Sequence, residues 1–180
     1  PVIFHPRVGN GLLRSLAGAI SGPAVARGTS FLKDRMGEQV FAPGLNVIED
    51  PHVHRGLKSA PFDAEGLARR RNLVIQDGHL TTWFLSLSSA RQLGLAPTGH
   101  ASRGTSAPPG PSPSNMWLEP GETHVDQLFA DVAEGFYVTE MMGMGVNQVT
   151  GDYSRGAAGF WIENGQIAYP VAEVTVAGNL

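Results

Sequence analysis

Apolar residues gather in short runs along this chain, and two pairs of runs predict β-hairpins. The expected pairs are residues 73–76 with 80–87 across Asp77-Gly78, and residues 159–163 with 166–171 across Asn164-Gly165. Asp-Gly and Asn-Gly readily take the positive φ angles of a type I′ turn, whose twist matches the strands that it joins. The two hairpins are therefore the strongest structural predictions from the sequence.

Further strands are expected at residues 45–48, 136–139 and 174–176. The first is ended by Asp50-Pro51, and the last follows the second hairpin as an additional strand. Residues 11–20 carry an apolar stripe at helical spacing that Gly22-Pro23 ends. Helices are also predicted for residues 123–134, between a Thr123 cap and Gly135, for 31–36 after a Ser30 cap, and for 88–93 before Gly94.

These elements predict an α+β fold with mainly antiparallel sheets, arranged as an open barrel or a sandwich, and a few short helices. The chain has 23 Gly and 13 Pro, which favours frequent turns over long helices. A length of 180 residues is enough for one domain with a sizeable core, so residues 1–180 are predicted to form a single domain. Because the chain begins at Pro1 and ends directly after a strand-like run, we expect a fragment of a longer polypeptide.

Composition narrows the classes of function. The net charge of −3 argues against nucleic-acid binding through a broad basic face. No apolar run approaches the roughly 20 residues that a membrane span needs, so no membrane partner is expected. With 0 Cys, disulfides and thiolate chemistry are excluded within these residues.

Two groups of residues could hold a metal ion. His52 and His54 share a face if their segment is extended, and Asp63 and Glu65 form a pair of carboxylates. An independent metal-dependent hydrolase that uses these four residues is one hypothesis. Exposed turns explain both groups as well.

Other motifs are weaker. Arg69-Arg70-Arg71 is typical of a solvated strand edge, although it could bind a carboxylate or phosphate. Residues 98–102, TGHAS, bring His and Ser together without a nucleophile elbow. Gly143 and Gly145 do not form a dinucleotide fingerprint. The Pro- and Ser-rich residues 101–114 suit a mobile surface loop, or a loop beside a substrate cleft.

Several segments together resemble the C-terminal domain of the TldD/PmbA family, on its PmbA (TldE) branch. The matching stretches, in family order, are SGPAVARGTSFLKDRMGEQV (21–40), DPHVHRGLKSAPFDAEGLARRR (50–71), NLVIQDGHLTTWFLSLSSARQLGLAPTGHASR (72–103), NMWLEPG (115–121) and residues 135–180, from GFYVTEMMGMG to VTVAGNL. The resemblance implies a mostly antiparallel β domain and a further N-terminal α/β domain that is absent here.

The TldD branch of this family carries an HExxxH zinc motif on its first helix. The shared GTS at 28–30 aligns Leu13, Arg14 and Gly18 with the His, Glu and His of that motif. None of the three side chains can bind zinc or accept a proton from water. The resemblance therefore implies no catalytic residue and no metal in this chain, with zinc on a TldD-type partner.

Proteins of the PmbA branch pair with a TldD-like metallopeptidase subunit, and an older label for the family is modulator of DNA gyrase. The resemblance implies a cytoplasmic heterodimer that hydrolyses unfolded or leader peptides, with a homodimer as the alternative assembly. Candidates for the peptide cleft or the subunit interface are Ser21, Thr29, Asp63, Glu65, Thr98, Gly143 and Gly145. A peptide- or protein-binding module without any peptidase partner is the remaining hypothesis.

Overall fold

The computed structural model describes residues 1–180, and they form two compact units. One unit combines Pro1–Arg14 with Pro120–Leu180, and the other consists of Ser15–Glu119. Helix α1 (Pro6–Ala19) contributes its first residues to the former unit and its last to the latter. We call these the terminal unit and the central unit.

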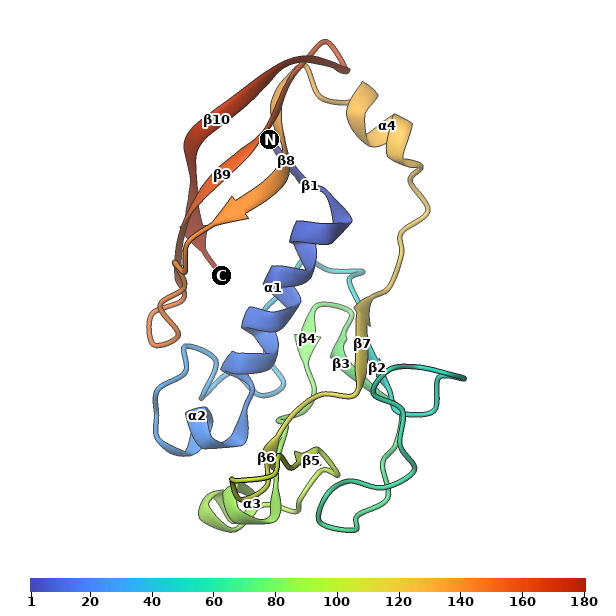
Figure 1. Ribbon diagram of the computed structural model, residues 1–180, viewed down its shortest axis with the longest axis vertical. Coiled ribbons are helices and arrows are strands. Elements are labelled where there is room, and N and C mark those ends of the chain that lie inside the picture. Colours follow the sequence, from blue (N-terminus) through green and yellow to red (C-terminus); the bar gives the residue numbers. More distant parts are fainter. The chain divides into compact units, whose positions relative to one another are not determined.

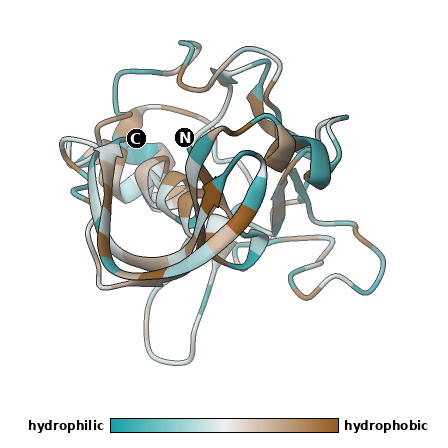
Figure 2. Ribbon diagram, turned by 90° about the horizontal axis from the view of Figure 1, so that it is seen from above, coloured by the Kyte–Doolittle hydropathy of each residue, from teal (hydrophilic) through white to brown (hydrophobic).

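The terminal unit is built on a four-stranded sheet in the order β1-β8-β9-β10 (Figure 1). β1 (Val2–Phe4) runs parallel to β8 (Glu134–Met142), whereas β8, β9 (Asp152–Glu163) and β10 (Gln166–Asn179) are antiparallel. Hydrophobic and hydrophilic residues alternate in places along the long strands (Figure 2). Phe136, Val138 and Ala157 are buried on this sheet, and side chains such as Trp161 pack against them.

The central unit contains a second four-stranded antiparallel sheet, in the order β4-β3-β2-β7. Its strands are β2 (Val47–Asp50), β3 (Asn72–Gln76), β4 (His79–Leu80) and β7 (Asn115–Leu118). Two short helices, α2 (Gly22–Ala26) and α3 (Leu87–Leu93), and a small hairpin of β5 (Ala101–Ser102) and β6 (Gly110–Pro111) complete it. Burial of apolar strand and helix residues, among them Val47, Ile75, Leu80 and Phe84, supplies its core.

Both predicted hairpin turns are confirmed. Asp77 and Gly78 have φ angles of 48° and 78°, and Asn164 and Gly165 have 49° and 79°. The strands that follow differ from the prediction. β4 ends at Leu80, whereas β10 continues to Asn179 and includes the strand that the sequence predicted separately at 174–176. A bulge between Val171 and Val174, with Glu173 at a φ of 57°, explains why the apolar pattern is interrupted there.

The helix predictions were correct in part. α3 ends as expected at Gly94, which has a φ of 66°, and the predicted helix at 11–20 forms but begins earlier, at Pro6. The helix predicted for 123–134 is wrong in extent: α4 covers Val125–Ala130, its N-cap is His124 instead of Thr123, and Glu134 already belongs to β8. The helix predicted for 31–36 is also wrong, because the Ser30 hydroxyl accepts the Leu32 N–H in a turn.

The α+β fold with mainly antiparallel sheets is confirmed, and neither large sheet closes into a barrel. The predicted loop at 101–114 is partly ordered, because β5 and β6 pair within it. No helix is both long and apolar enough to cross a membrane.

Candidate functional site

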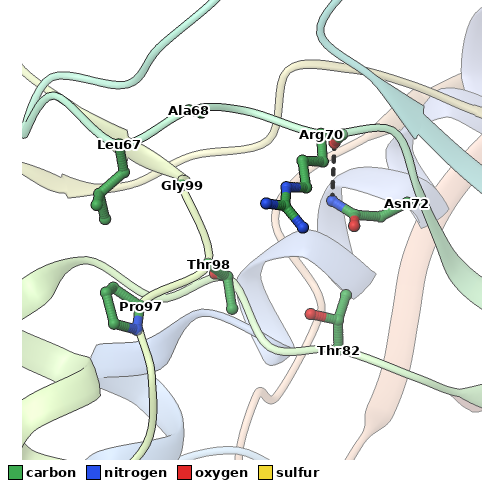
Figure 3. Close-up of a pocket in the computed structure, with 8 residues that line it drawn as sticks. All are labelled: Leu67, Ala68, Arg70, Asn72, Thr82, Pro97, Thr98 and Gly99. Atoms are coloured by element: carbon green, nitrogen blue, oxygen red, sulfur yellow. Dashed lines mark hydrogen bonds between the residues drawn. The ribbon is translucent and has the colours of Figure 1, made fainter.

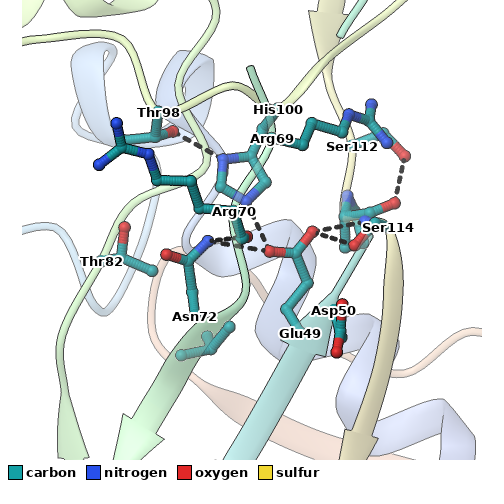
Figure 4. Close-up of polar contacts among 12 residues, drawn as sticks. Glu49, Asp50, Arg69, Arg70, Asn72, Thr82, Thr98, His100, Ser112 and Ser114 are labelled. Carbon is teal, nitrogen blue, oxygen red and sulfur yellow. Dashed lines mark hydrogen bonds and ion pairs between the residues drawn. The ribbon is translucent and has the colours of Figure 1, made fainter. Parts of the chain in front are cut away.

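A buried carboxylate organises the polar interior of the central unit. Glu49 lies on β2 within the apolar segment VIED, and four hydrogen bonds converge on its two oxygens (Figure 4). The Ser114 N–H and hydroxyl donate to Oε1 at 2.7 and 2.5 Å. Asn72 Nδ2 and His100 Nε2 lie 3.1 and 3.0 Å from Oε2. The sheet positions one of these partners directly, since Asn72 on β3 lies opposite Glu49 in the strand register.

The surroundings of Glu49 keep its side chain ionised. Burial raises its pKa, but hydrogen bonds and the positive charge from His100, together with hydrogen bonds from Ser114, outweigh burial and lower the pKa from 4.5 to about 2. A carboxylate that accepts hydrogen bonds from four donors is a poor general base, because its lone pairs are already engaged.

His100 connects Glu49 to a second polar side chain. Its Nδ1 lies 2.7 Å from Thr98 Oγ1, and its ring stacks on Phe84 with centroids 4.4 Å apart. Thr98 Oγ1 also accepts the Leu85 N–H at 2.8 Å and donates to the Trp83 carbonyl at 3.1 Å. The two ring nitrogens of His100 thus connect the Glu49 carboxylate to the Thr98 hydroxyl.

The order carboxylate, imidazole and hydroxyl is also that of a hydrolytic triad, but the chemistry differs. A nucleophilic hydroxyl needs a base to remove its proton and a free path to the substrate. Here the Thr98 hydroxyl is held by two backbone groups as well as by His100. The arrangement therefore acts as a rigid scaffold that fixes Thr98.

A pocket of about 450 Å³ opens beside this scaffold (Figure 3). Its lining is half apolar and half polar, from Leu67, Ala68, Pro97 and Gly99 and from Arg70, Asn72, Thr82 and Thr98. Thr98 and Asn72 belong both to this lining and to the polar interior around Glu49. Of the residues predicted as cleft candidates, Thr98 is thus the one that lines this pocket.

The two candidate carboxylates, Asp63 and Glu65, accept hydrogen bonds from backbone N–H groups. Asp63 Oδ1 accepts the Glu65 and Leu67 N–H groups, both at 2.9 Å, and its Oδ2 accepts the Ala101 N–H at 3.0 Å. Glu65 Oε2 accepts the Leu87 N–H at 2.7 Å, at the first residue of α3. The carboxylates therefore fix the loop before β3 and the start of a helix.

The structure does not bring His52 and His54 together with a third metal-ligating side chain. His52 Nε2 lies 3.2 Å from the Arg69 carbonyl, and His54 is exposed. No group of three or more His, Asp or Glu side chains in the chain is arranged to hold a metal ion. The hypothesis of an independent hydrolase built on His52, His54, Asp63 and Glu65 therefore finds no geometric support.

The other cleft candidates have structural surroundings that explain them without a ligand. Ser21 forms a bridge with Phe84 and precedes α2, and Thr29 Oγ1 donates to the Ala24 carbonyl. Gly143 has a φ of 72°. A Cβ on Gly145 would lie 1.6 Å from the Ser154 carbonyl oxygen, so glycine permits the close approach of β9. A role of these residues in a cleft or interface stays a prediction.

The three residues that the family resemblance aligns with the zinc motif, Leu13, Arg14 and Gly18, lie on α1. Leu13 is half-buried, and Arg14 and Gly18 are exposed. None offers a metal-binding atom, so the helix has no zinc ligand at these positions.

Sequence reasoning missed Glu49, Ser114 and the role of His100. The available signal was a carboxylate inside an apolar strand, because a charged residue is rarely buried without partners. The partners themselves lie 51 and 65 positions away in the sequence, and only the fold brings them together.

Fold and sequence agree on the class of protein. The sequence profile of the PmbA/TldA metallopeptidase C-terminal domain matches residues 1–180, and the chain belongs to this family. It is 47% identical to the metalloprotease PmbA of Escherichia coli O157:H7 and 42% identical to a PmbA homologue of Haemophilus influenzae. All of this chain is covered in both comparisons, and it spans 38% of the length of each relative.

Solved structures support the same assignment. A proposed modulator of DNA gyrase from Bacteroides thetaiotaomicron superposes with a TM-score of 0.89 at 31% identity, over 99% of this chain and 38% of that protein. A proposed modulator of DNA gyrase from Thermotoga maritima superposes with a TM-score of 0.88 at 35% identity, over 99% of this chain and 41% of that protein.

Proposed function

We propose that this chain is the C-terminal domain of a non-catalytic subunit in a TldD/TldE-type metallopeptidase that cleaves unfolded or leader peptides. In this proposal a TldD-like partner holds the zinc ion and performs hydrolysis. The present chain supplies subunit interface and part of the peptide-binding surface. The complex is cytoplasmic, and the complete subunit also has an N-terminal α/β domain.

The observation that carries the proposal is the composition of α1. Zinc hydrolysis requires ligands with lone pairs and a base for the bound water. Leu13, Arg14 and Gly18 provide an aliphatic group, a permanent cation and no side chain. The absence of another suitable cluster of His, Asp and Glu side chains supports the same conclusion for residues 1–180.

Three other assignments compete with this one. The relatives are named metalloproteases, and a complete subunit could hold zinc through residues outside this chain. A homodimer or a peptide-binding module without a peptidase partner would also keep the fold. These alternatives differ from the proposal in where zinc is bound and in whether a partner is needed.

The test is a comparison of the full-length protein alone, a TldD-type subunit alone, and the two together. Zinc per chain and hydrolysis of an unfolded peptide are measured for each. We expect zinc and hydrolysis to depend on the TldD-type subunit and to disappear when the glutamate of its HExxxH motif is replaced by Gln. Arg14→Ala in the present chain is expected to retain activity, because Arg14 is not a catalytic base.

Stoichiometric zinc together with activity in the isolated full-length protein would reject the proposal. Failure of the two subunits to associate would instead favour a homodimer or a binding module.

A further inference from the structure

We propose that the pocket beside Thr98 binds the C-terminal residue of a peptide, with Arg70 pairing with the terminal carboxylate. The choice of a peptide as ligand rests on the proposed function. The recognition of a carboxylate rests on the pocket itself, whether or not a zinc-bearing partner exists.

The three consecutive arginines have different surroundings in the structure. Arg69 Nη2 donates to the Ala101 carbonyl at 3.2 Å, and Arg71 Nε lies 3.8 Å from Asp50 Oδ2. The Arg70 side chain makes no hydrogen bond or ion pair within the chain, and its guanidinium points into the pocket (Figure 3). The run therefore leaves one cation available in a concave site, where a carboxylate could accept two parallel hydrogen bonds.

The pocket has an apolar and a polar side, which suits a ligand of mixed character. Leu67 and Pro97 lie at one end, and Arg70, Asn72 and Thr82 lie at the other (Figure 3). The last residue of a peptide has the same division, because its carboxylate and peptide group are polar and its side chain can be apolar. The volume of about 450 Å³ is typical of sites for small ligands.

Asn72 supplies the acceptor that a peptide end needs. Its Nδ2 donates to Glu49 Oε2 at 3.1 Å and to the Arg70 carbonyl at 3.0 Å, so both amide hydrogens are used. Oδ1 is then the free atom of this side chain, and it can accept the N–H of the last peptide bond. The hydrogen bond from Asn72 to Glu49 thereby orients the amide so that Oδ1 is the atom available to a ligand.

The charges favour a single negative charge on the ligand. Arg70 is the pocket's one cation, and the buried Glu49 carboxylate lies directly behind Asn72. A phosphate dianion would find only this one guanidinium among the lining side chains to balance its charge. A carboxylate monoanion matches the single guanidinium.

The walls of the pocket are held in place before any ligand binds. Thr98 is fixed by His100 and by the Leu85 N–H. Gly99 has a φ of 74°, and a Cβ there would lie 3.0 Å from the Ala68 carbonyl oxygen, so this part of the backbone is closely packed. A preorganised site loses less conformational freedom on binding.

The experiment measures binding of three dipeptides to the full-length protein by calorimetry, without zinc or partner. The probes are acetyl-Ala-Leu with a free carboxylate, its C-terminal amide, and acetyl-Ala-Asp amide, whose only carboxylate is in the side chain. We expect the free acid to bind in preference to both amides, and Arg70→Ala to weaken its binding about tenfold or more. Arg70→Lys should restore only part of the affinity, because the lysine ammonium keeps the positive charge but lacks the planar, two-pronged geometry of the guanidinium.

Arg71→Ala is the matched control, since Arg71 belongs to the same run of arginines but faces Asp50. This variant should bind acetyl-Ala-Leu with the affinity of the wild type. Equal binding of acid and amide, no binding of the acid, or unchanged binding by Arg70→Ala would overturn the proposal. Equal binding of the Asp amide would overturn the assignment to a chain end. Thermal unfolding of each variant establishes that it is folded. Since binding is measured without zinc, failure of the peptidase proposal is detected separately by zinc content and hydrolysis.

Discussion

His100 Nε2 lies 3.0 Å from Glu49 Oε2, and each residue is only 2% exposed. Two groups that can carry charge are thus removed from water together, and the Ser114 and Asn72 donors complete the site. Such a pair contributes little compared with a well-packed apolar pair, but removal of one partner leaves the other unsatisfied.

Replacement of Glu49 by Gln should lower the free energy of unfolding by about 2–4 kcal/mol. The substituted amide presents N–H donors where the native carboxylate accepts four hydrogen bonds, so at least one pair of donors must face each other. Denaturant unfolding measures the change. Glu122→Gln, at an exposed position, is the control and should leave the midpoint unchanged. Equal midpoints for Glu49→Gln and the wild type would contradict the structural role.

The stabilisation from Glu49 should depend on pH in the acid range. Its pKa is lowered from 4.5 to about 2 on folding, so the contribution is complete above pH 4.5 and is lost as the pH falls toward 2. The shift corresponds to about 3 kcal/mol. The difference in unfolding free energy between wild type and Glu49→Gln, measured at several pH values, should shrink over this window. A difference that stays constant from pH 5 to 2 would argue against the lowered pKa.

Gly159→Ala should destabilise the terminal unit by about 3 kcal/mol or more. A Cβ at this position would lie 1.9 Å from the Tyr137 carbonyl oxygen, so β8 and β9 would have to move apart. Gly178→Ala in β10 is the matched control, because nothing lies within 4 Å of a Cβ there. Thermal unfolding should separate the two variants clearly, and equal melting temperatures would refute the steric explanation.

Asp63→Ala should reduce stability by about 1–3 kcal/mol, because three buried or half-buried backbone N–H groups lose their acceptor. The same loop carries Leu67 and Ala68, so binding of the dipeptide acid should weaken as well. Asp34→Ala, at an exposed position, is the control. If Asp63 were a metal ligand instead, a chelator would lower the melting temperature of the wild-type protein, whereas we expect no change.

The sequence predicted local structure best where a short motif has one favourable geometry. Asp77-Gly78 and Asn164-Gly165 form the expected turns, and Gly94 ends α3. Predictions failed where contacts between residues far apart in the sequence determine the structure, as they do for the extent of α4. Its apolar residues continue at helical spacing, but the chain leaves the helix at Asp131 and enters β8, whose Phe136 and Val138 are buried in the sheet. Pairing with β1 and β9 there outweighs helix propensity.

The sequence by itself determined the family and the antiparallel α+β class, because these depend on residue identity and order. Only the tertiary structure decided which polar residues meet. It joined Glu49 to His100 and Ser114, assigned Asp63 and Glu65 to backbone N–H groups, and left Arg70 of three adjacent arginines unpaired at a pocket. Hydrogen bonds and ion pairs act over a few ångströms, and the distances between residues far apart in sequence are set by strand register and packing.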